Sequence, residues 1–286
     1  MKHAILITAY KDIESLIDLI DTMGDSFNFY IHLDRKRKLN SSTLNQIKNV
    51  EVSNTYNVNW GGLNHFRAIL ELSERALKNN ENVFFHLITA EDYPIKNSKY
   101  ILDMDTAQSY LHYFPFPKMT WDKNGGSDRY NYFHLYDVFD AKTKIGSRVI
   151  YLFILIQKCL KIKRKALPFS KMYGGSTYWS LSRQLLNFTT QQVDNNLLAR
   201  LKYTFCAEEY IFHSILLNSP LTHKITNSNL RYIDWHSKRG SDPAFLDETD
   251  FDILKNSNAI FARKIKKSPN SKLLKLLKHH IGILKK

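Results

Sequence analysis

The sequence predicts an α/β fold with an open, mostly parallel sheet flanked by helices. A continuous apolar run, typical of a strand buried on both faces, occurs at residues 4–8, and a further strand is expected at residues 83–88. Between these segments, apolar residues recur three and four positions apart, which is the spacing of amphipathic helices. Strands that alternate with helices in this way favour parallel pairing through helical crossovers.

The expected elements follow one another closely along the first hundred residues. We expect strands at residues 4–8, 27–33, 50–52 and 83–88, and helices at residues 13–20 and 63–77. Further on, we expect a loop at residues 122–128, a strand at 177–181 and a helix at 205–217 that opens with Glu208-Glu209. This order indicates one domain over residues 1–267, followed by a basic amphipathic tail over residues 268–286.

Charge and cysteine content narrow the class of protein. The chain has 286 residues, 43% of them hydrophobic, and a formal net charge of +14, which predicts attraction to phosphates, nucleic acid or anionic lipid. Its two cysteines, Cys159 and Cys206, are too few for a disulfide scaffold and lack zinc-ligand spacing. The first apolar run is too short for a signal peptide. We therefore expect a cytoplasmic protein, either free or peripheral on the inner face of the plasma membrane.

Two basic segments are candidates for contact with an anionic membrane. Residues 149–165 and 272–286 interleave lysines with Leu and Ile, a composition found in helices that lie on lipid surfaces. The alternative is a solvated helix that packs one apolar face on the domain. The sequence leaves both interpretations open.

Three short segments fall at or just after the ends of expected strands. They are Asp34, Trp60-Gly61-Gly62 and Glu91-Asp92. In open α/β sheets, ligands bind beyond the carboxyl ends of the strands. We therefore expect these three segments to converge on one binding edge.

Seven segments, taken in order, resemble the core-2/I-branching β-1,6-N-acetylglucosaminyltransferase family, whose relatives include peptide O-xylosyltransferases. They are residues 31–34, 60–62, 90–96, 174–179, 206–212, 231–235 and 261–264. The resemblance implies a GT-A-like, Rossmann-like fold, a UDP-sugar donor, inversion at the anomeric carbon, and no metal or other cofactor. The two cysteines are fewer than those of animal members, and we expect a bacterial member without their anchor and stem.

Glu209 matches the catalytic glutamate of that family. Inverting transfer needs one base that takes the proton from the acceptor hydroxyl as its oxygen attacks the sugar. Glu208 is the neighbouring candidate, but the register of the following residues favours Glu209. The alternative is that both are ordinary acids at the start of a helix.

The departing diphosphate needs positive charge. The resemblance assigns this role to Arg263 and Lys264, with Lys238 and Arg239 as further candidates. The alternative for the first pair is a solvated basic tail. At the fourth expected strand's end, Ala90-Glu91-Asp92 stands where an Asp-x-Asp metal motif would lie, and this argues against a metal site.

Two acids are expected to contact the donor. The resemblance places Asp34 against the nucleoside, and Asp92 could accept hydrogen bonds from donor-sugar hydroxyls. Each acid could instead close a turn, because Asp34 precedes a basic run and Asp92 precedes Tyr93-Pro94.

Aromatic and small residues are the candidates for sugar contacts. Trp235 matches an aromatic residue that the family places against the acceptor, and Ser176 and Tyr178 lie in another matching segment. Trp60 precedes two glycines that would let the backbone approach a ligand, or it is a core tryptophan.

The expected activity is transfer of N-acetylglucosamine, or a related sugar, to a glycan or lipid-linked saccharide in bacterial surface-polysaccharide synthesis. A xylosyl-, glucosyl- or galactosyltransferase is the alternative within the family. A basic nucleic-acid-binding protein is the alternative from another class. The sequence shows no zinc-finger, helix-turn-helix or aromatic RNA-binding motif, so we expect no nucleic-acid partner.

Overall fold

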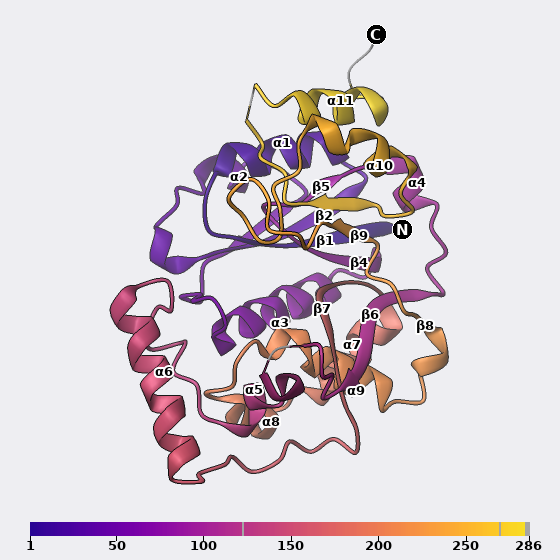
Figure 1. The fold of residues 1–286 in the computed structure, drawn as a ribbon. Coiled ribbons are helices and arrows are strands. Elements are labelled where there is room, and N and C mark those ends of the chain that lie inside the picture. Colours follow the sequence, from indigo (N-terminus) through magenta and orange to yellow (C-terminus); the bar gives the residue numbers. More distant parts are fainter. Residues whose placement is uncertain (122, 269, 284–286) are drawn as a thin grey trace.

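The computed structural model describes residues 1–121, 123–268 and 270–283, and its central feature is a seven-stranded sheet (Figure 1). The strand order is β3-β2-β1-β4-β7-β6-β8. The strands are β1 (Lys2–Ala9), β2 (Phe27–Leu33), β3 (Val50–Ser53), β4 (Asn82–Thr89), β6 (Ser109–Phe116), β7 (Met172–Ser182) and β8 (Ile225–Thr226). The first four pair in parallel, and β7 runs antiparallel to both β4 and β6. This mostly parallel sheet confirms the expected α/β fold, and it is consistent with a GT-A-like fold.

Two hydrophobic cores lie on opposite faces of the sheet, because β1 is buried on both sides. Ile5 and Ile7 face a core that includes the apolar side of α1 (Ile13–Met23), whereas Ala4 and Leu6 face a core that includes α3 (Leu63–Lys78). Figure 1 shows α1 and α3 on either side of the sheet. Strands covered on both faces are rich in apolar residues at consecutive positions, which is why β1, β2 and β4 were predictable.

The remaining helices surround these layers. They are α2 (Ser42–Asn45), α4 (Ser98–Leu102), α5 (Asp128–Asn131), α6 (Lys144–Cys159), α7 (Arg183–Gln192), α8 (Asn195–Leu201), α9 (Ile211–Leu217), α10 (Phe251–Asn256) and α11 (Lys272–His280). Short 3₁₀ turns are η1 (Arg35–Arg37), η2 (Lys123–Gly126), η3 (Ala207–Glu209), η4 (Thr222–Lys224) and η5 (Glu248–Asp250). The segment expected as a loop over residues 122–128 thus contains η2 and the start of α5, and residue 122 lies outside the described residues.

The helix expected over residues 205–217 is two elements. Its first part is the 3₁₀ turn η3, and α9 begins only at Ile211, after Tyr210 with φ −146°. Cys206 starts the turn in the left-handed conformation, with φ 51°, and its amide donates to the Gly61 carbonyl at 2.9 Å. Glu209 therefore lies in a tight turn tied to the start of α3, and not in the first turn of an α-helix.

A second sheet of three short strands joins the end of the chain to its first half. Its order is β5 (Tyr93–Pro94), β10 (Phe261–Arg263) and β9 (Arg231–Ile233). β10 is antiparallel to β5 and parallel to β9. Just beyond β10, the Ile265 amide donates to the Glu91 carbonyl at 3.0 Å. This sheet places residues 261–264 beside the carboxyl end of β4.

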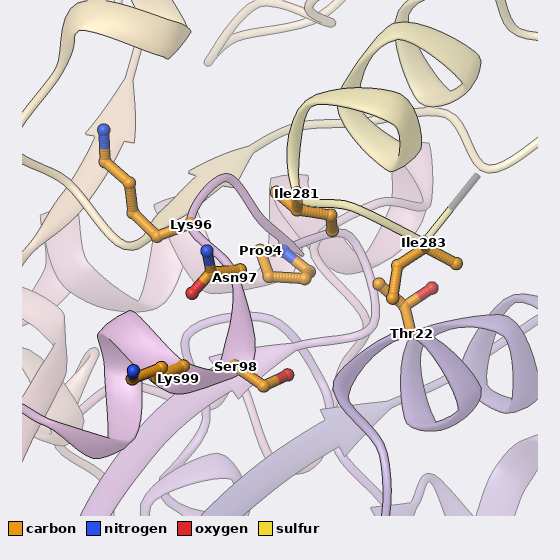
Figure 2. A pocket seen from close by; sticks show the side chains of 8 residues that line it. All are labelled: Thr22, Pro94, Lys96, Asn97, Ser98, Lys99, Ile281 and Ile283. Atoms are coloured by element: carbon orange, nitrogen blue, oxygen red, sulfur yellow. The ribbon is translucent and has the colours of Figure 1, made fainter. Parts of the chain in front are cut away.

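Helix α11 packs on the core that contains α1 (Figure 1). Leu273, Leu274 and Leu277 are buried there, so the apolar face of this helix is covered by protein. Beyond α11, Ile281 and Ile283 line a small cavity of about 220 Å³ with Thr22 and Pro94 (Figure 2). Of the helices in the described parts of the chain, none is long and apolar enough to cross a bilayer.

Candidate active site

The three segments that were expected to converge meet at the carboxyl end of β1. The Asp34 amide donates to the Ala9 carbonyl at 2.8 Å, and the Ala90 amide donates to the Thr8 carbonyl at 3.2 Å. From the first turn of α3, His65 Nε2 lies 3.3 Å from Thr8 Oγ1. The segments after β2 and β4 and the start of α3 therefore meet at one edge of the sheet.

Glu208 is anchored to this edge. Its Oε1 lies 3.0 Å from His65 Nδ1, and the residue is only 8% exposed. His65 thus contacts both Glu208 and Thr8. Because Glu208 is buried and tied to the scaffold, it is suited to holding the turn in place.

Glu209 faces the other way and pairs with Arg129 from α5. The Arg129 guanidinium lies over two rings, 4.1 Å from the centroid of Trp121 and 5.0 Å from that of Phe205. The Glu209 side chain keeps 28% of its surface exposed, although its surroundings are densely packed. Desolvation by these surroundings is the largest influence, and it outweighs Arg129 and raises the pKa of Glu209 to about 7.

These two glutamates are therefore not equivalent. A carboxylate with a pKa near neutrality is a stronger base than an ordinary glutamate and is still substantially ionised at neutral pH. Glu209 combines that basicity with access to solvent, whereas Glu208 is buried against His65. The arrangement favours Glu209 as the proton acceptor, as the sequence predicts.

Trp60 is 58% exposed, so the alternative of a core tryptophan is wrong. Its ring stands edge-on to Phe205, with centroids 5.3 Å apart. The two glycines after it make room for protein and not for a ligand. A Cβ on Gly61, where φ is 80°, would lie 2.4 Å from Phe205 Cε2, and a Cβ on Gly62 would lie 2.3 Å from Asp137 Oδ1. The expectation that these glycines let a ligand approach the backbone is therefore wrong, because Phe205 and Asp137 fill that space.

Arg263 is buried, with 7% exposed, so a solvated tail is the wrong description of this residue. Its guanidinium lies 3.7 Å from Glu91 Oε2, 4.0 Å from Asp92 Oδ2 and 4.5 Å from the Tyr178 ring centroid. Within the described chain, Arg263 Nε and Nη1 have no hydrogen-bond partner. A buried guanidinium with unsatisfied donors is suited to binding an anion.

Lys264 continues this cationic group. Its Nζ donates to Ser241 Oγ at 3.0 Å, and desolvation lowers its pKa. Lys267 comes next, with its Nζ 5.6 Å from the Tyr93 ring centroid, and burial lowers its pKa to about 8. Sequence reasoning missed Lys267 because it lies among other lysines, and no pattern separates it from the exposed Lys266.

Glu91 gathers further groups that sequence reasoning missed. It accepts a hydrogen bond from the Tyr10 hydroxyl at 3.0 Å, and Lys11 Nζ lies 2.9 Å away. Although burial opposes the shift, Lys11, Tyr10 and Arg263 hold the pKa of Glu91 below its usual value. Tyr10 and Lys11 directly follow β1, and this position at a strand end was the signal that could have identified them.

Asp34 and Asp92 both close turns. Asp34 Oδ1 accepts from the amides of Val58 at 3.0 Å and Lys36 at 3.2 Å. Asp92 is fully buried, and its Oδ2 accepts from the amide of Thr89 at 2.7 Å. Asp92 Oδ1 has no partner among the described residues. The turn interpretation holds for both acids, and contact with the donor stays a prediction.

The remaining predicted residues lie in the segment after β9 and in strand β7. Lys238 Nζ donates to Asp234 Oδ2 at 2.8 Å, and Arg239 pairs with Asp250 at 3.0 Å, so both cations are engaged within their own segment. Their binding of a nucleotide stays a prediction. Trp235 is 66% exposed and available to a ligand. Ser176 Oγ accepts from Asn229 at 3.0 Å.

Comparison with known proteins identifies the family of this chain. The family model of the core-2/I-branching enzymes matches residues 4–254. The chain belongs to this family. Xylosyltransferase 2 of Mus musculus is 24% identical over 88% of this chain and 30% of its own length, and Xylosyltransferase 2 of Homo sapiens gives the same values. Beta-glucuronosyltransferase GlcAT14A of Arabidopsis thaliana is 32% identical over 37% of this chain and 25% of its own length.

The family member studied here thus spans about 30% of the length of the xylosyltransferases that it matches. These relatives are named for the transfer of different sugars, so the comparison supports a sugar transferase without fixing the sugar. Among the residues that the structure describes, no group of three or more His, Cys, Asp and Glu side chains is arranged to hold a metal ion.

Proposed function

We propose that the protein is an inverting, metal-independent glycosyltransferase that moves a sugar, N-acetylglucosamine or a related one, from a UDP-sugar to a carbohydrate acceptor. The observation that carries this proposal is the position of Glu209. It is a partly exposed carboxylate with a pKa near 7, near the edge of the sheet where open α/β folds bind their ligands. Glu208 and His65 hold the turn that presents it.

In the proposed step, Glu209 takes the proton from the acceptor hydroxyl. The acceptor oxygen forms the new bond to the anomeric carbon, from the face opposite the nucleotide. The bond between that carbon and the β-phosphate oxygen breaks, and UDP leaves with its electron pair. Because attack and departure lie on opposite faces, the configuration at this carbon inverts.

The charge that grows on the departing diphosphate needs cations that are already in place. Arg263 and Lys264 are the proposed source, with Lys11 near them through Glu91. The unsatisfied donors of the buried Arg263 support this role, because phosphate oxygens would complete its hydrogen bonds. A protein that supplies this charge itself needs no divalent ion or other cofactor.

The exposed indoles of Trp60 and Trp235 are proposed to contact sugar rings, because an aromatic face packs well on the apolar face of a sugar. Asp34, Lys238 and Arg239 are proposed nucleotide contacts, and Asp92, Ser176 and Tyr178 are proposed to shape the donor-sugar site. The proposed setting is the bacterial cytoplasm, where the enzyme would extend a glycan or lipid-linked saccharide for surface polysaccharide.

The decisive experiment is a screen of UDP-sugars for slow hydrolysis, with and without EDTA. The donors should include UDP-linked N-acetylglucosamine, xylose, glucose and galactose, together with glucuronic acid because of the plant relative. We expect one donor to be hydrolysed at a rate that EDTA does not change. A requirement for a divalent ion would contradict the proposed mechanism, and failure to bind any UDP-sugar would contradict the proposed activity.

The net charge of +14 supports one rival function, nucleic-acid binding. Tight, salt-sensitive binding of oligonucleotides by a protein with no affinity for UDP would favour it. We expect the opposite pattern, with UDP competing with the donor and oligonucleotides having no effect on turnover.

A further inference from the structure

Helix α6 runs along the outer edge of the molecule (Figure 1). Its buried residues are Gly146, Ile150 and Gln157, and neither core cluster of the described residues includes any part of this helix. Gln157 attaches the helix through the backbone of Phe133, accepting from its amide at 2.8 Å and donating to its carbonyl at 2.9 Å. The helix is therefore attached to the domain through Gln157 and the buried Ile150, outside both core clusters.

The outward face of α6 and its C-terminal extension is apolar and uncovered. The exposed side chains are Ile145 (75%), Tyr151 (57%), Leu152 (55%), Leu155 (37%), Ile156 (54%), Leu160 (65%) and Ile162 (43%). Leu152, Leu155 and Ile156 follow the spacing of residues that share one helix face. An uncovered apolar face of this size marks an interaction site.

Helix α11 provides an internal comparison. It is also basic and amphipathic, but Leu273, Leu274 and Leu277 are buried in the core cluster. Its largest exposed apolar side chain is Leu276, at 40%. Of the two segments with a membrane-like composition, α6 is thus the one whose apolar face remains available.

Positive charge flanks the apolar face of α6 at both ends of the helix. Residues 140–165 contain eight Lys and Arg residues and one acidic residue, Asp140. Six of these cations are exposed, namely Lys142, Lys144, Arg148, Lys161, Lys163 and Lys165. A cationic border beside apolar side chains is complementary to the anionic headgroups and acyl chains of a bilayer surface.

We propose that α6 docks the protein on an anionic membrane surface, with Leu152, Leu155 and Ile156 inserted between the headgroups. Charge argues against a second copy of the chain as the partner. Two copies packed through this face would bring two cationic borders together, and like charges at an interface oppose association. Anionic lipid, in contrast, satisfies both the apolar face and its border.

This docking surface lies next to the candidate active site. Lys142, two residues before α6, places its Nζ 5.5 Å from the Tyr10 ring centroid, and the Tyr10 hydroxyl donates to Glu91. A docked molecule would hold the site close to the membrane. If the proposed function holds, on which this step rests, the acceptor is a saccharide carried by a membrane lipid.

The test is co-sedimentation of the full chain with vesicles at low salt. We compare vesicles of phosphatidylcholine and phosphatidylglycerol with vesicles of phosphatidylcholine alone. We expect binding to the anionic vesicles, weakened by salt. The double variant Leu152→Glu/Ile156→Glu should lower the partition constant by at least about tenfold. The matched control is Leu276→Glu, a similarly exposed leucine on α11, and it should bind within about twofold of wild type.

Three results would overturn the docking proposal. The first is that the wild-type protein does not bind anionic vesicles, and the second is that the double variant binds them as strongly as wild type. The third is that the wild-type protein forms a dimer in light scattering, whereas the double variant is monomeric and still binds vesicles. Thermal melting and hydrolysis of the UDP-sugar in solution check that both variants fold.

Glu209→Gln separates this proposal from the proposed function. This variant should bind anionic vesicles like wild type, because Glu209 lies outside α6. Vesicle binding by a wild-type protein that transfers no sugar would refute the proposed activity alone. Transfer to soluble acceptors by a protein that never binds vesicles would refute the docking alone.

Discussion

The guanidinium of Arg129 pairs with the carboxylate of Glu209 and lies between the rings of Trp121 and Phe205. Phe205 in turn contacts Trp60, with ring centroids 5.3 Å apart. The proposed base is therefore linked through Arg129 and Phe205 to an exposed aromatic residue that is available to a sugar. A side chain that moves one of these rings would change the environment of the proton acceptor.

Glu209→Gln should lower kcat for transfer by about 10²–10⁴-fold, the usual contribution of a general base. Its affinity for UDP should stay within about twofold, because the cations proposed to bind the diphosphate lie on a different segment. Single-turnover transfer and UDP titration measure the two effects. Glu208→Gln is the matched control and should retain more activity. Undiminished transfer by Glu209→Gln would refute its role.

The pH dependence of kcat/KM should rise through an apparent pKa of about 7, because Glu209 must be ionised to accept a proton. Arg129→Met removes the cation that lowers this pKa, so the midpoint should move to higher pH. Initial rates of wild type and Arg129→Met, measured across this pH range at subsaturating donor, test both midpoints. A wild-type midpoint near 4.5, the ordinary value for glutamate, would contradict this assignment.

The same pKa affects stability. The folded-state pKa of Glu209 is above the unfolded value of 4.5, so the folded protein binds more protons between about pH 4.5 and 7. The contribution of this group to the free energy of unfolding should therefore decrease as pH rises through that window. Urea unfolding of wild type and Glu209→Gln at several pH values measures this contribution, because the glutamine side chain does not titrate.

Arg263→Gln and Lys264→Gln should each weaken UDP binding by roughly tenfold or more. They should differ in stability. Arg263 lies beside the fully buried Asp92, and its loss would remove one of the cations that compensate this carboxylate. Lys264 contacts Ser241 and a backbone carbonyl, so its replacement should cost less. Isothermal titration with UDP and thermal melting distinguish the pair, and unchanged UDP affinity in both would contradict the assignment.

Gly61→Ala should destabilise the protein by about 2 kcal/mol more than Gly24→Ala. Both glycines have positive φ values, 80° and 79°, so an alanine is strained at either position. A Cβ on Gly61 also meets Phe205 at 2.4 Å, whereas nothing lies within 4 Å of a Cβ on Gly24. Urea unfolding measures the difference, and equal effects would show that Phe205 shifts without cost.

Leu277→Ala should cost about 2–4 kcal/mol of unfolding free energy, because Leu277 is fully buried in the core cluster. Leu276→Ala, on the exposed side of the same helix, should cost less than about 1 kcal/mol. Denaturant unfolding compares the two. Similar small losses would show that α11 contributes little to the domain.

The parts of the fold that the sequence predicted are those in which local pattern and tertiary burial agree. The expected strand at residues 27–33 is β2 with the same bounds, because all its residues are buried and five of the seven are apolar or aromatic. The sheet of β5, β10 and β9 was not predicted. Its strands are two or three residues long, too short for a periodic pattern, and they pair only in the folded chain.

The site divides in a similar way. Glu209, Arg263 and Lys264 could be selected because they lie in segments that resemble the family. Arg129 and His65 could not, because their roles come from contacts with Glu209 and Glu208, 80 and 143 positions away in sequence. The separate 3₁₀ turn before α9 was not predicted. It depends on the hydrogen bond from the Cys206 amide to the Gly61 carbonyl, and no local sequence pattern indicates that contact.

Strand β10 brings Arg263 back to Glu91 and Asp92, more than 170 positions earlier in the chain. During translation, a growing polypeptide therefore has all the strands of the large sheet available well before it has this cationic partner. Glu91 can already pair with Lys11, but both acids must wait for Arg263 until nearly the last part of the chain has been made. A prematurely terminated chain would lack Arg263 and Lys264, and it could not retain a nucleotide sugar through them.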